Sequence, residues 1–249
     1  MSWLPPFLVP MSDVAPVTVE AVDIPRWLFW SVAGPTVVGW LSTYLLSIRQ
    51  TILDGRIAVP AYMVVVNFSW EFSLGFILEQ TPSQRQINTV WAVINVFLFY
   101  QAFRYGPRDY PHLSRFTFRV LLGGLAVWSS LAVMAGANEF HDRDGMYIGM
   151  IINVFLSAAF ILMLRRRDSS VGQSLHIAVA KFLGTFSAGL TGFLLYPSRV
   201  LFLVLIPTMV VLDIVYIVLL YRRMRLEGRN PWSLRGYRSP RGYGSPVVA

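Results

Sequence analysis

Long apolar runs separated by short polar segments dominate the sequence. Seven of these runs are 17 to 22 residues long, and a helix of about 20 residues crosses the hydrocarbon core of a bilayer. None of the intervening segments is long enough to fold as a separate domain. The pattern predicts an all-α membrane protein, a seven-transmembrane helix bundle, with spans at 27–48, 58–78, 87–103, 120–137, 146–164, 175–196 and 200–221.

The two ends of the chain differ in composition from this helical part. Residues 1–26 form an expected N-terminal extramembrane segment, in which acidic residues precede the first Arg, the reverse of a secretory signal peptide. Residues 222–249 form a basic tail rich in Gly, Pro, Ser and Arg, a composition typical of disorder. The transmembrane domain is therefore expected at 27–221.

The charged residues indicate how the chain is oriented. Only 14% of residues are charged, against about 25% in a soluble domain. Of the 21 cations, 16 fall in the first, third and fifth loops and the tail. The positive-inside rule then places the N-terminus outside and the C-terminus in the cytoplasm. The net charge of +8 is thus explained by topology and by attraction to anionic membrane lipids, and no nucleic-acid partner is expected.

Residue types that are missing exclude several kinds of chemistry. The chain has no Cys, so disulfides, thiolate metal sites and Cys nucleophiles are excluded. The three His residues lack metal-ligand spacing, and no phosphate-binding glycine motif is present. We therefore expect no metal, no cofactor and no nucleotide-driven transport.

Three ionisable residues lie clearly within the predicted spans, namely Glu71, Lys181 and Asp213. Each costs about 2.5–3.5 kcal/mol on insertion scales and normally faces a bundle interior. For Lys181, snorkelling or pairing with Asp213 is as good an interpretation as a catalytic role. The two carboxylates, Glu71 and Asp213, lie deep in the predicted spans, and this indicates a functional role. Replacing them by amides is expected to leave insertion intact, because it removes a possible charge from the membrane.

Polar and aromatic residues accompany Glu71 at helical spacing. Asn67 and Glu71 are four residues apart on one face with Trp70 beside them, and Trp91 and Asn95 repeat this spacing on the third span. A single intramembrane Asn most often joins helices by hydrogen bonds. The combination around Glu71 favours a polar site inside the bundle.

Seven spans alone do not define a function. A retinal protein needs a Lys on its last span, whereas Lys181 lies on the sixth. The ends of the third and seventh spans fit a G-protein-coupled receptor poorly, and the two halves are not related as in a sugar or amino-acid transporter. A small transporter or receptor that uses the charged residues as an ion or ligand path stays open as the alternative.

Four motifs in chain order resemble a known family. They are VVVNFSWEF at 64–72, INVFLFYQAFRYGP at 94–107, AKFLGTFSAG at 180–189 and LDIVYIVLLYRRMR at 212–225. Their order and spacing are similar to those of the integral-membrane terpene cyclases of meroterpenoid and indole-terpenoid biosynthesis, from about residue 27 to 225. The two functional carboxylates of that family fall on Glu71 and Asp213.

The resemblance implies a monomeric, membrane-embedded terpene cyclase. Its substrate would be an aromatic or indole compound that already carries a farnesyl or geranylgeranyl chain. The enzyme would protonate the terminal alkene or epoxide and cyclise the polyene without loss of diphosphate. The absence of a DDxxD-type Asp cluster for Mg²⁺ agrees with this reaction. The Arg-rich composition favours a bacterial cytoplasmic membrane, with the endoplasmic reticulum as the expected location if the protein is eukaryotic.

The resemblance and the cost of charges in a membrane both select Glu71 and Asp213 as the expected catalytic pair. Their surroundings suggest that Glu71, with no obvious cation nearby, is the neutral acid and that Asp213 is an ionised group that takes the final proton or orients the donor. If the two groups are coupled, the protons belong to the pair. Aromatic faces would stabilise the passing carbocation. The expected substrate-binding residues are Asn67, Trp70, Trp91, Asn95, Lys181, Phe186 and Tyr216.

Overall fold

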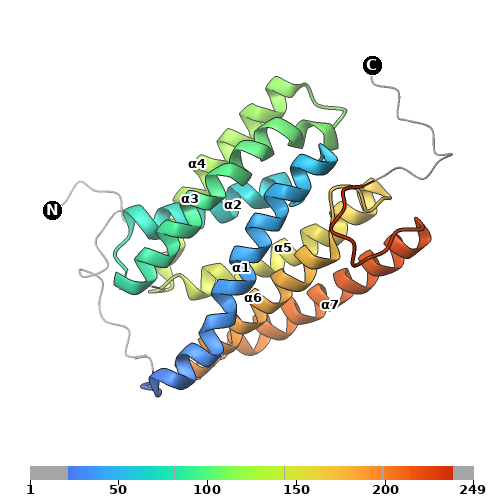
Figure 1. The fold of residues 1–249 in the computed structure, drawn as a ribbon. Helices are drawn as coiled ribbons and strands as arrows, with labels where there is room; N and C mark the ends of the chain where they lie inside the picture. The colour runs from blue at the N-terminus through green and yellow to red at the C-terminus, as the bar shows by residue number, and fades with distance from the viewer. Residues whose placement is uncertain (1–21, 81, 143, 198, 238–249) are drawn as a thin grey trace.

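The computed structural model describes residues 22–80, 82–142, 144–197 and 199–237. Within these ranges all regular secondary structure is helical (Figure 1). Each of the seven apolar runs coincides with a helix, which confirms the all-α prediction. The elements are α1 (Arg26–Asp54), α2 (Ala61–Phe72), the π-helix η3 (Ser73–Ile77), α3 (Pro82–Tyr105), the 3₁₀-helix η4 (Gly106–Asp109), α4 (Arg115–Glu139), α5 (Met146–Arg167), α6 (Leu175–Leu195) and α7 (Phe202–Leu226).

Five of the described helices, α1, α4, α5, α6 and α7, are long and apolar enough to cross a membrane. α2 and η3 together form a shorter apolar helix, Ala61–Ile77. α3 is more polar than these helices, with Arg85 in its first turns. These features describe an integral membrane protein built of helices. The count of seven spans and the orientation of the termini stay predictions.

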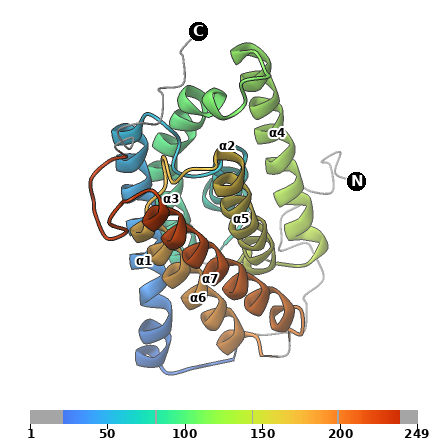
Figure 2. The ribbon, with the colours of Figure 1, turned by 90° about the vertical axis from the view of Figure 1, so that its right-hand side faces the viewer.

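Six of the helices form a closed ring. α6 packs between α1 and α7, α5 joins α7 to α2, and α3 joins α2 back to α1. α4 packs on the outer side of α2, so that it flanks the ring (Figures 1 and 2). The interior of the bundle is therefore surrounded by helices from both halves of the chain.

α1 and α6 cross very closely at Gly39 and Gly184. A Cβ on Gly39 would lie 2.5 Å from the backbone nitrogen of Gly184 and 2.8 Å from the carbonyl oxygen of Ala180. Small residues at such crossings allow helix backbones to pack directly. Trp40 lies over the same crossing, since a Cβ on Gly184 would be 2.9 Å from its Cδ1. The crossing thus fixes where the Trp40 ring enters the bundle.

We expect Gly39→Ala to lower the stability of the protein by about 1–3 kcal/mol, the usual cost of overpacking. Gly34→Ala is the matched control on the same helix, because a Cβ on Gly34 would meet nothing within 4 Å. Thermal unfolding in detergent measures the difference. Equal midpoints for the two variants would contradict the close crossing.

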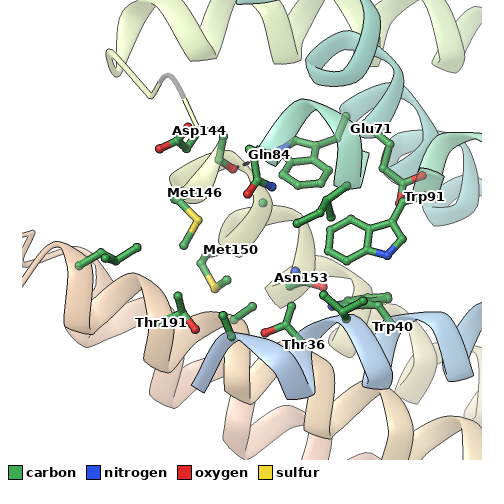
Figure 3. Close-up of a pocket in the computed structure, with 18 of the residues that line it drawn as sticks. Thr36, Trp40, Glu71, Gln84, Trp91, Asp144, Met146, Met150, Asn153 and Thr191 are labelled. Atoms are coloured by element: carbon green, nitrogen blue, oxygen red, sulfur yellow. Dashed lines mark hydrogen bonds between the residues drawn. The ribbon is translucent and has the colours of Figure 1, made fainter. Parts of the chain in front are cut away.

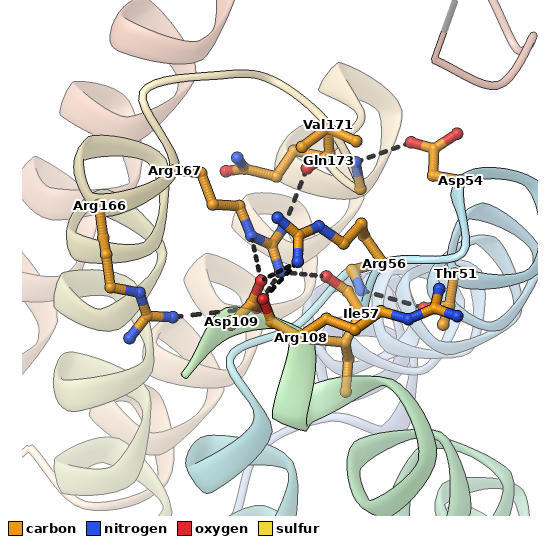
Figure 4. A network of polar contacts seen from close by, with 12 residues as sticks. Thr51, Asp54, Arg56, Ile57, Arg108, Asp109, Arg166, Arg167, Val171 and Gln173 are labelled. Carbon is orange, nitrogen blue, oxygen red and sulfur yellow. Dashed lines mark hydrogen bonds and ion pairs between the residues drawn. The ribbon is translucent and has the colours of Figure 1, made fainter. Parts of the chain in front are cut away.

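Asp109, at the end of η4, joins three loops at one end of the bundle (Figure 4). Its carboxylate accepts hydrogen bonds from the guanidinium of Arg167 and lies 3.4 Å from Nη1 of Arg56. Arg167 also donates to the carbonyl oxygens of Ile57 and Val171, at 2.8 and 2.9 Å. The first, third and fifth loops, which carry many of the cations, therefore lie at the same end of the bundle. We call this the basic end.

Part of the C-terminal tail packs against the basic end. Glu227 accepts a hydrogen bond from the backbone nitrogen of Ser170 at 2.9 Å, and Asp54 accepts one from that of Tyr237 at 2.6 Å. Residues 238–249, which belong to the tail expected to be disordered, lie outside the described residues, as do residues 1–21. The division of the chain at 26 and 221 stays a prediction.

Asp109→Asn is expected to destabilise the protein strongly. The side chains of Asp109 and Arg167 are each 2% exposed, and removing one partner of a buried ion pair costs about 3–5 kcal/mol. Asp168→Asn is the control, because the Asp168 side chain is 87% exposed in its pair with Arg223. Thermal unfolding in detergent compares the two variants, and similar midpoints would show that Asp109 does not hold the loops together.

Candidate active site

The ring of helices surrounds a cavity of about 320 Å³. This volume lies near the lower limit of the range for small-molecule sites, about 300–1,000 Å³. Residues of α1, α2, α3, α5 and α6 line the cavity, and apolar and aromatic side chains make up most of the wall (Figure 3). Its aromatic residues are Phe29, Trp30, Trp40, Tyr44, Trp70, Trp91 and Tyr196.

Glu71 supplies the carboxyl group at one end of this cavity and is 1% exposed. It lies in the last turn of α2, directly before the π-helix η3, and π-helical turns are frequent at functional sites. Its Oε1 accepts hydrogen bonds from the Tyr44 hydroxyl and from Nδ2 of Asn67, the latter at 2.9 Å. Its Oε2 accepts one from Nδ2 of Asn95, also at 2.9 Å. Three helices thus converge on one carboxyl, and no cation in the described part of the chain pairs with it.

Asp213 belongs to a second buried polar centre, formed by α5, α6 and α7. Nζ of Lys181 lies 2.7 and 3.0 Å from its two carboxylate oxygens and also donates to Oγ of Ser157 at 2.7 Å. Oγ1 of Thr185 donates to Oδ2 of Asp213 at 3.0 Å. Lys181 and Asp213 are each 1% exposed. The pairing that the sequence left open is therefore present, and neither residue lines the cavity.

A small cavity of about 20 Å³ lies between the two centres. Tyr44, Asn67 and Asn95 line it on the side of Glu71, and Lys181 lines it on the other side. Its volume is sufficient for one water molecule, which needs about 10–15 Å³ by this measure. Of the Lys181–Asp213 pair, Lys181 is thus the member that lines this small cavity.

Four of the predicted substrate-binding residues line the cavity or bind Glu71 in its wall. Asn67, Trp70 and Trp91 line the cavity itself. Asn95 binds Glu71 and lines the small cavity behind it. The i, i+4 spacing on the second and third spans therefore brings these residues to one site.

The other three predicted substrate-binding residues lie outside the cavity wall. Lys181 is engaged with Asp213, and the buried Tyr216 donates to Oε1 of Gln173 at 3.0 Å. Phe186 is 41% exposed. These three residues therefore do not form part of the cavity wall.

The contribution of α1 was not predicted from the sequence. Tyr44 binds Glu71, and Thr36, Val37 and Trp40 line the cavity on the same helix. Thr36 and Val37 precede Trp40 by four and three residues, and Tyr44 follows it by four, as expected for a single helix face. That spacing was the available signal, but the stripe contains no carboxyl or ammonium group, and it was the membrane cost of such groups that identified Glu71, Lys181 and Asp213.

Five of the described helices are apolar enough to cross a membrane, and the bundle surrounds an aromatic cavity with a buried carboxyl group in its wall. This arrangement is that of a helical membrane protein with an internal site for a largely apolar small molecule. The family profile described as Pyr4-like transmembrane terpene cyclases matches residues 20–225. The chain therefore belongs to this family and is a terpene cyclase.

Curated relatives agree with this assignment. Terpene cyclase dpasB of Apiospora sacchari is 30% identical over 164 residues, which are 64% of this chain and 67% of the relative. Terpene cyclase pyr4 of Aspergillus fumigatus is 25% identical over 192 residues, 72% and 75% of the two chains. Terpene cyclase olcD of Penicillium canescens is 30% identical over 155 residues, 60% and 63%. No solved structure matches the chain. The family resemblance inferred from the four motifs is confirmed.

Proposed function

We propose that this terpene cyclase acts on an aromatic or indole compound that carries a farnesyl or geranylgeranyl chain. It protonates the terminal alkene or epoxide of that chain and closes the polyene into rings without loss of diphosphate. The observation that carries the proposal is Glu71, a buried carboxyl in the wall of an aromatic cavity. The relatives named terpene cyclases support the class of reaction.

Glu71 is the proposed proton donor. An ionised carboxylate is costly in a buried site unless a cation accompanies it, and only Asp213 of the two deep carboxylates has such a partner. The surroundings of Glu71 also accommodate a neutral acid. Oδ1 of Asn95 has no hydrogen-bond partner, and turning this amide would present that oxygen to the acidic O–H. Tyr44 and Asn67 then hold the other carboxyl oxygen in place.

The aromatic wall supports the later steps. Protonation leaves a positive charge on carbon, and each ring closure uses one double bond and moves that charge along the chain. Trp40, Trp70 and Trp91 line the cavity beside Glu71. Their ring faces attract a cation by about 0.5–2 kcal/mol each without forming a bond to it. Loss of one proton ends the sequence, so substrate and product have the same mass.

Asp213 is proposed as a positioning residue that acts through Lys181. Lys181 lines the small cavity that Tyr44, Asn67 and Asn95 also line, whereas Asp213 contacts the ammonium group of Lys181 and does not line this cavity. A fixed positive group on that side stabilises the negative charge that develops on Glu71 as its proton leaves. Asp213 holds the ammonium group in this position and balances its positive charge.

The conversion of substrate tests the proposal. Membranes containing the protein, incubated with farnesylated and epoxyfarnesylated aromatic compounds, should produce a cyclised isomer of equal mass without an ion gradient. A transporter or receptor would leave the compounds unchanged. Membranes that contain Glu71→Gln in equal amount are the negative control.

The proposed topology is seven spans with the basic end in the cytoplasm, either of a bacterial cytoplasmic membrane or of an endoplasmic reticulum membrane. The Arg-rich composition favours the bacterial membrane, whereas the fungal origin of the relatives named above favours the endoplasmic reticulum.

We propose that the protein acts as a monomer. Each protomer encloses its own cavity, and the partners are membrane lipids and the prenylated substrate.

A reporter fused after Ala249 is expected to read out as cytoplasmic, because the basic loops and the described part of the tail lie at the same end of the bundle. Activity of a paired reporter that works only outside the cytoplasm gives the opposite control. An external readout would reverse the proposed orientation.

A further inference from the structure

The cavity has a second polar end. Asp144 lines it at the end opposite to Glu71, near Gln84 (Figure 3). Most of the wall between the two carboxyl groups is apolar, with Met146 and Met150 among its side chains, and Asn153 and Thr191 add polar groups to it. The cavity is therefore a mostly apolar passage with one carboxyl group at each end.

Asp144 has an acceptor that the protein does not use. Its Oδ2 accepts a hydrogen bond from the Tyr196 hydroxyl at 3.2 Å, whereas its Oδ1 is buried without a partner. An ionised carboxylate accepts hydrogen bonds only, so the remaining oxygen suits an N–H or O–H group.

The turn that carries Asp144 is held firmly. Asp142 accepts hydrogen bonds from the backbone nitrogens of Met146 and Tyr147, both at 2.8 Å, and so caps the start of α5. Gly145 has a φ of 68°, a left-handed conformation that favours glycine. Its carbonyl oxygen accepts a hydrogen bond from Nε1 of Trp70 at 3.2 Å. The Asp144 carboxylate is thus placed by the same residues that build the cavity wall.

We propose that Asp144 recognises the polar head of the substrate, an inference that rests on the proposed function. The unused oxygen of Asp144 accepts a hydrogen bond from an O–H or N–H group of the aromatic or indole ring. The prenyl chain then extends along the apolar wall and brings its terminal double bond or epoxide to Glu71. The substrate class is a prenylated ring that carries a hydrogen-bond donor. The free end of the prenyl chain then lies at the Glu71 end of the cavity, and the ring lies at the Asp144 end.

A pair of substrates that differ only in this donor tests the proposal. The probes are a farnesylated hydroxyarene and its methyl ether. The intact protein is expected to prefer the free hydroxyl by about 10-fold to 100-fold in kcat/KM, because a site that binds a donor rejects the analogue that lacks it. The preference should appear mainly in KM, since the reacting end of the chain is unchanged.

Asp144→Leu is expected to reduce this preference to about one, and Asp144→Asn, which keeps one acceptor oxygen, to an intermediate value. Asp168→Asn, on an 87% exposed side chain, should keep the preference of the unmodified protein. The preference is a ratio measured on one preparation, so a smaller amount of folded variant does not change it.

Two results would overturn the inference. The first is equal efficiency of the unmodified protein with both probes, and the second is the full preference in Asp144→Leu. In either case cyclisation of the prenyl chain still supports the proposed function. If the unmodified protein cyclises neither these probes nor the epoxyfarnesylated compounds, the proposed function fails together with the inference.

Discussion

The Glu71→Gln variant is expected to insert into membranes normally and to lose cyclisation by about 10²-fold to 10⁴-fold, the usual effect of removing a general acid. Gln keeps the shape of Glu, and its oxygen still accepts hydrogen bonds from Tyr44 and Asn67. Its NH₂ group faces Asn95, whose amide can turn to present an oxygen that is without a partner. The measurement is the rate of isomer formation at equal amounts of inserted protein.

Glu79→Gln is the matched control for this variant. Glu79 follows the π-helix η3 and is exposed, so the same chemical change there should leave the rate unaltered. A Glu71→Gln protein that binds the prenylated compound and cyclises it at a normal rate would contradict proton donation by Glu71. The transporter or receptor alternative would then have to be reconsidered.

Asp213→Asn is expected to reduce the amount of folded protein as well as the rate. The change leaves the buried Lys181 ammonium without its counter-charge, and breaking a buried ion pair from one side costs about 3–5 kcal/mol. This differs from the expectation drawn from the sequence, in which Asp213→Asn only relieves a charge. Fluorescence-detected size-exclusion chromatography in detergent measures the folded fraction.

The double variant Lys181→Met, Asp213→Asn separates folding from catalysis. It removes both charges, so the folded fraction should recover towards that of the unmodified protein. The rate per folded molecule is expected to stay about tenfold lower, equivalent to about 1.4 kcal/mol, because the positive group beside the Glu71 centre is gone. Thr185 remains as a polar partner for the new Asn side chain.

Two other outcomes of the double variant would each assign a different role to the Lys181–Asp213 pair. A normal rate per folded molecule would show that the pair only supports the fold. A loss of about 10²-fold or more with normal folding would show that one member of the pair transfers a proton itself. Either result would contradict the positioning role proposed for Asp213.

The positions of the helices could be predicted from the sequence because membrane insertion imposes a local rule. A helix that crosses a bilayer needs a continuous apolar stretch of fixed length, and each of the seven runs proved helical. The same rule identified Glu71, Lys181 and Asp213, since a charge in such a stretch is costly. The spacing of Asn67, Glu71, Trp91 and Asn95 further predicted which residues share a face.

The partners of these groups could not be predicted in the same way. Lys181 and Asp213 are 32 residues apart and form an ion pair, whereas Glu71 is bound by Tyr44, Asn67 and Asn95 from three helices. Which faces meet depends on how α1 crosses α6 at Gly39 and on how α2 packs against α3. Such packing arises from contacts between distant segments.

The sequence by itself determined a helical membrane protein, its family and the two carboxyl groups that deserve a functional role, because hydropathy and short motifs are local properties of the chain. Only the tertiary structure decided that Glu71 faces an aromatic cavity, that Asp213 lies outside the wall in an ion pair, and that Asp144 lines the opposite end. A cavity exists only between packed helices, and the environment of a carboxyl group is set by neighbours that the chain order does not reveal.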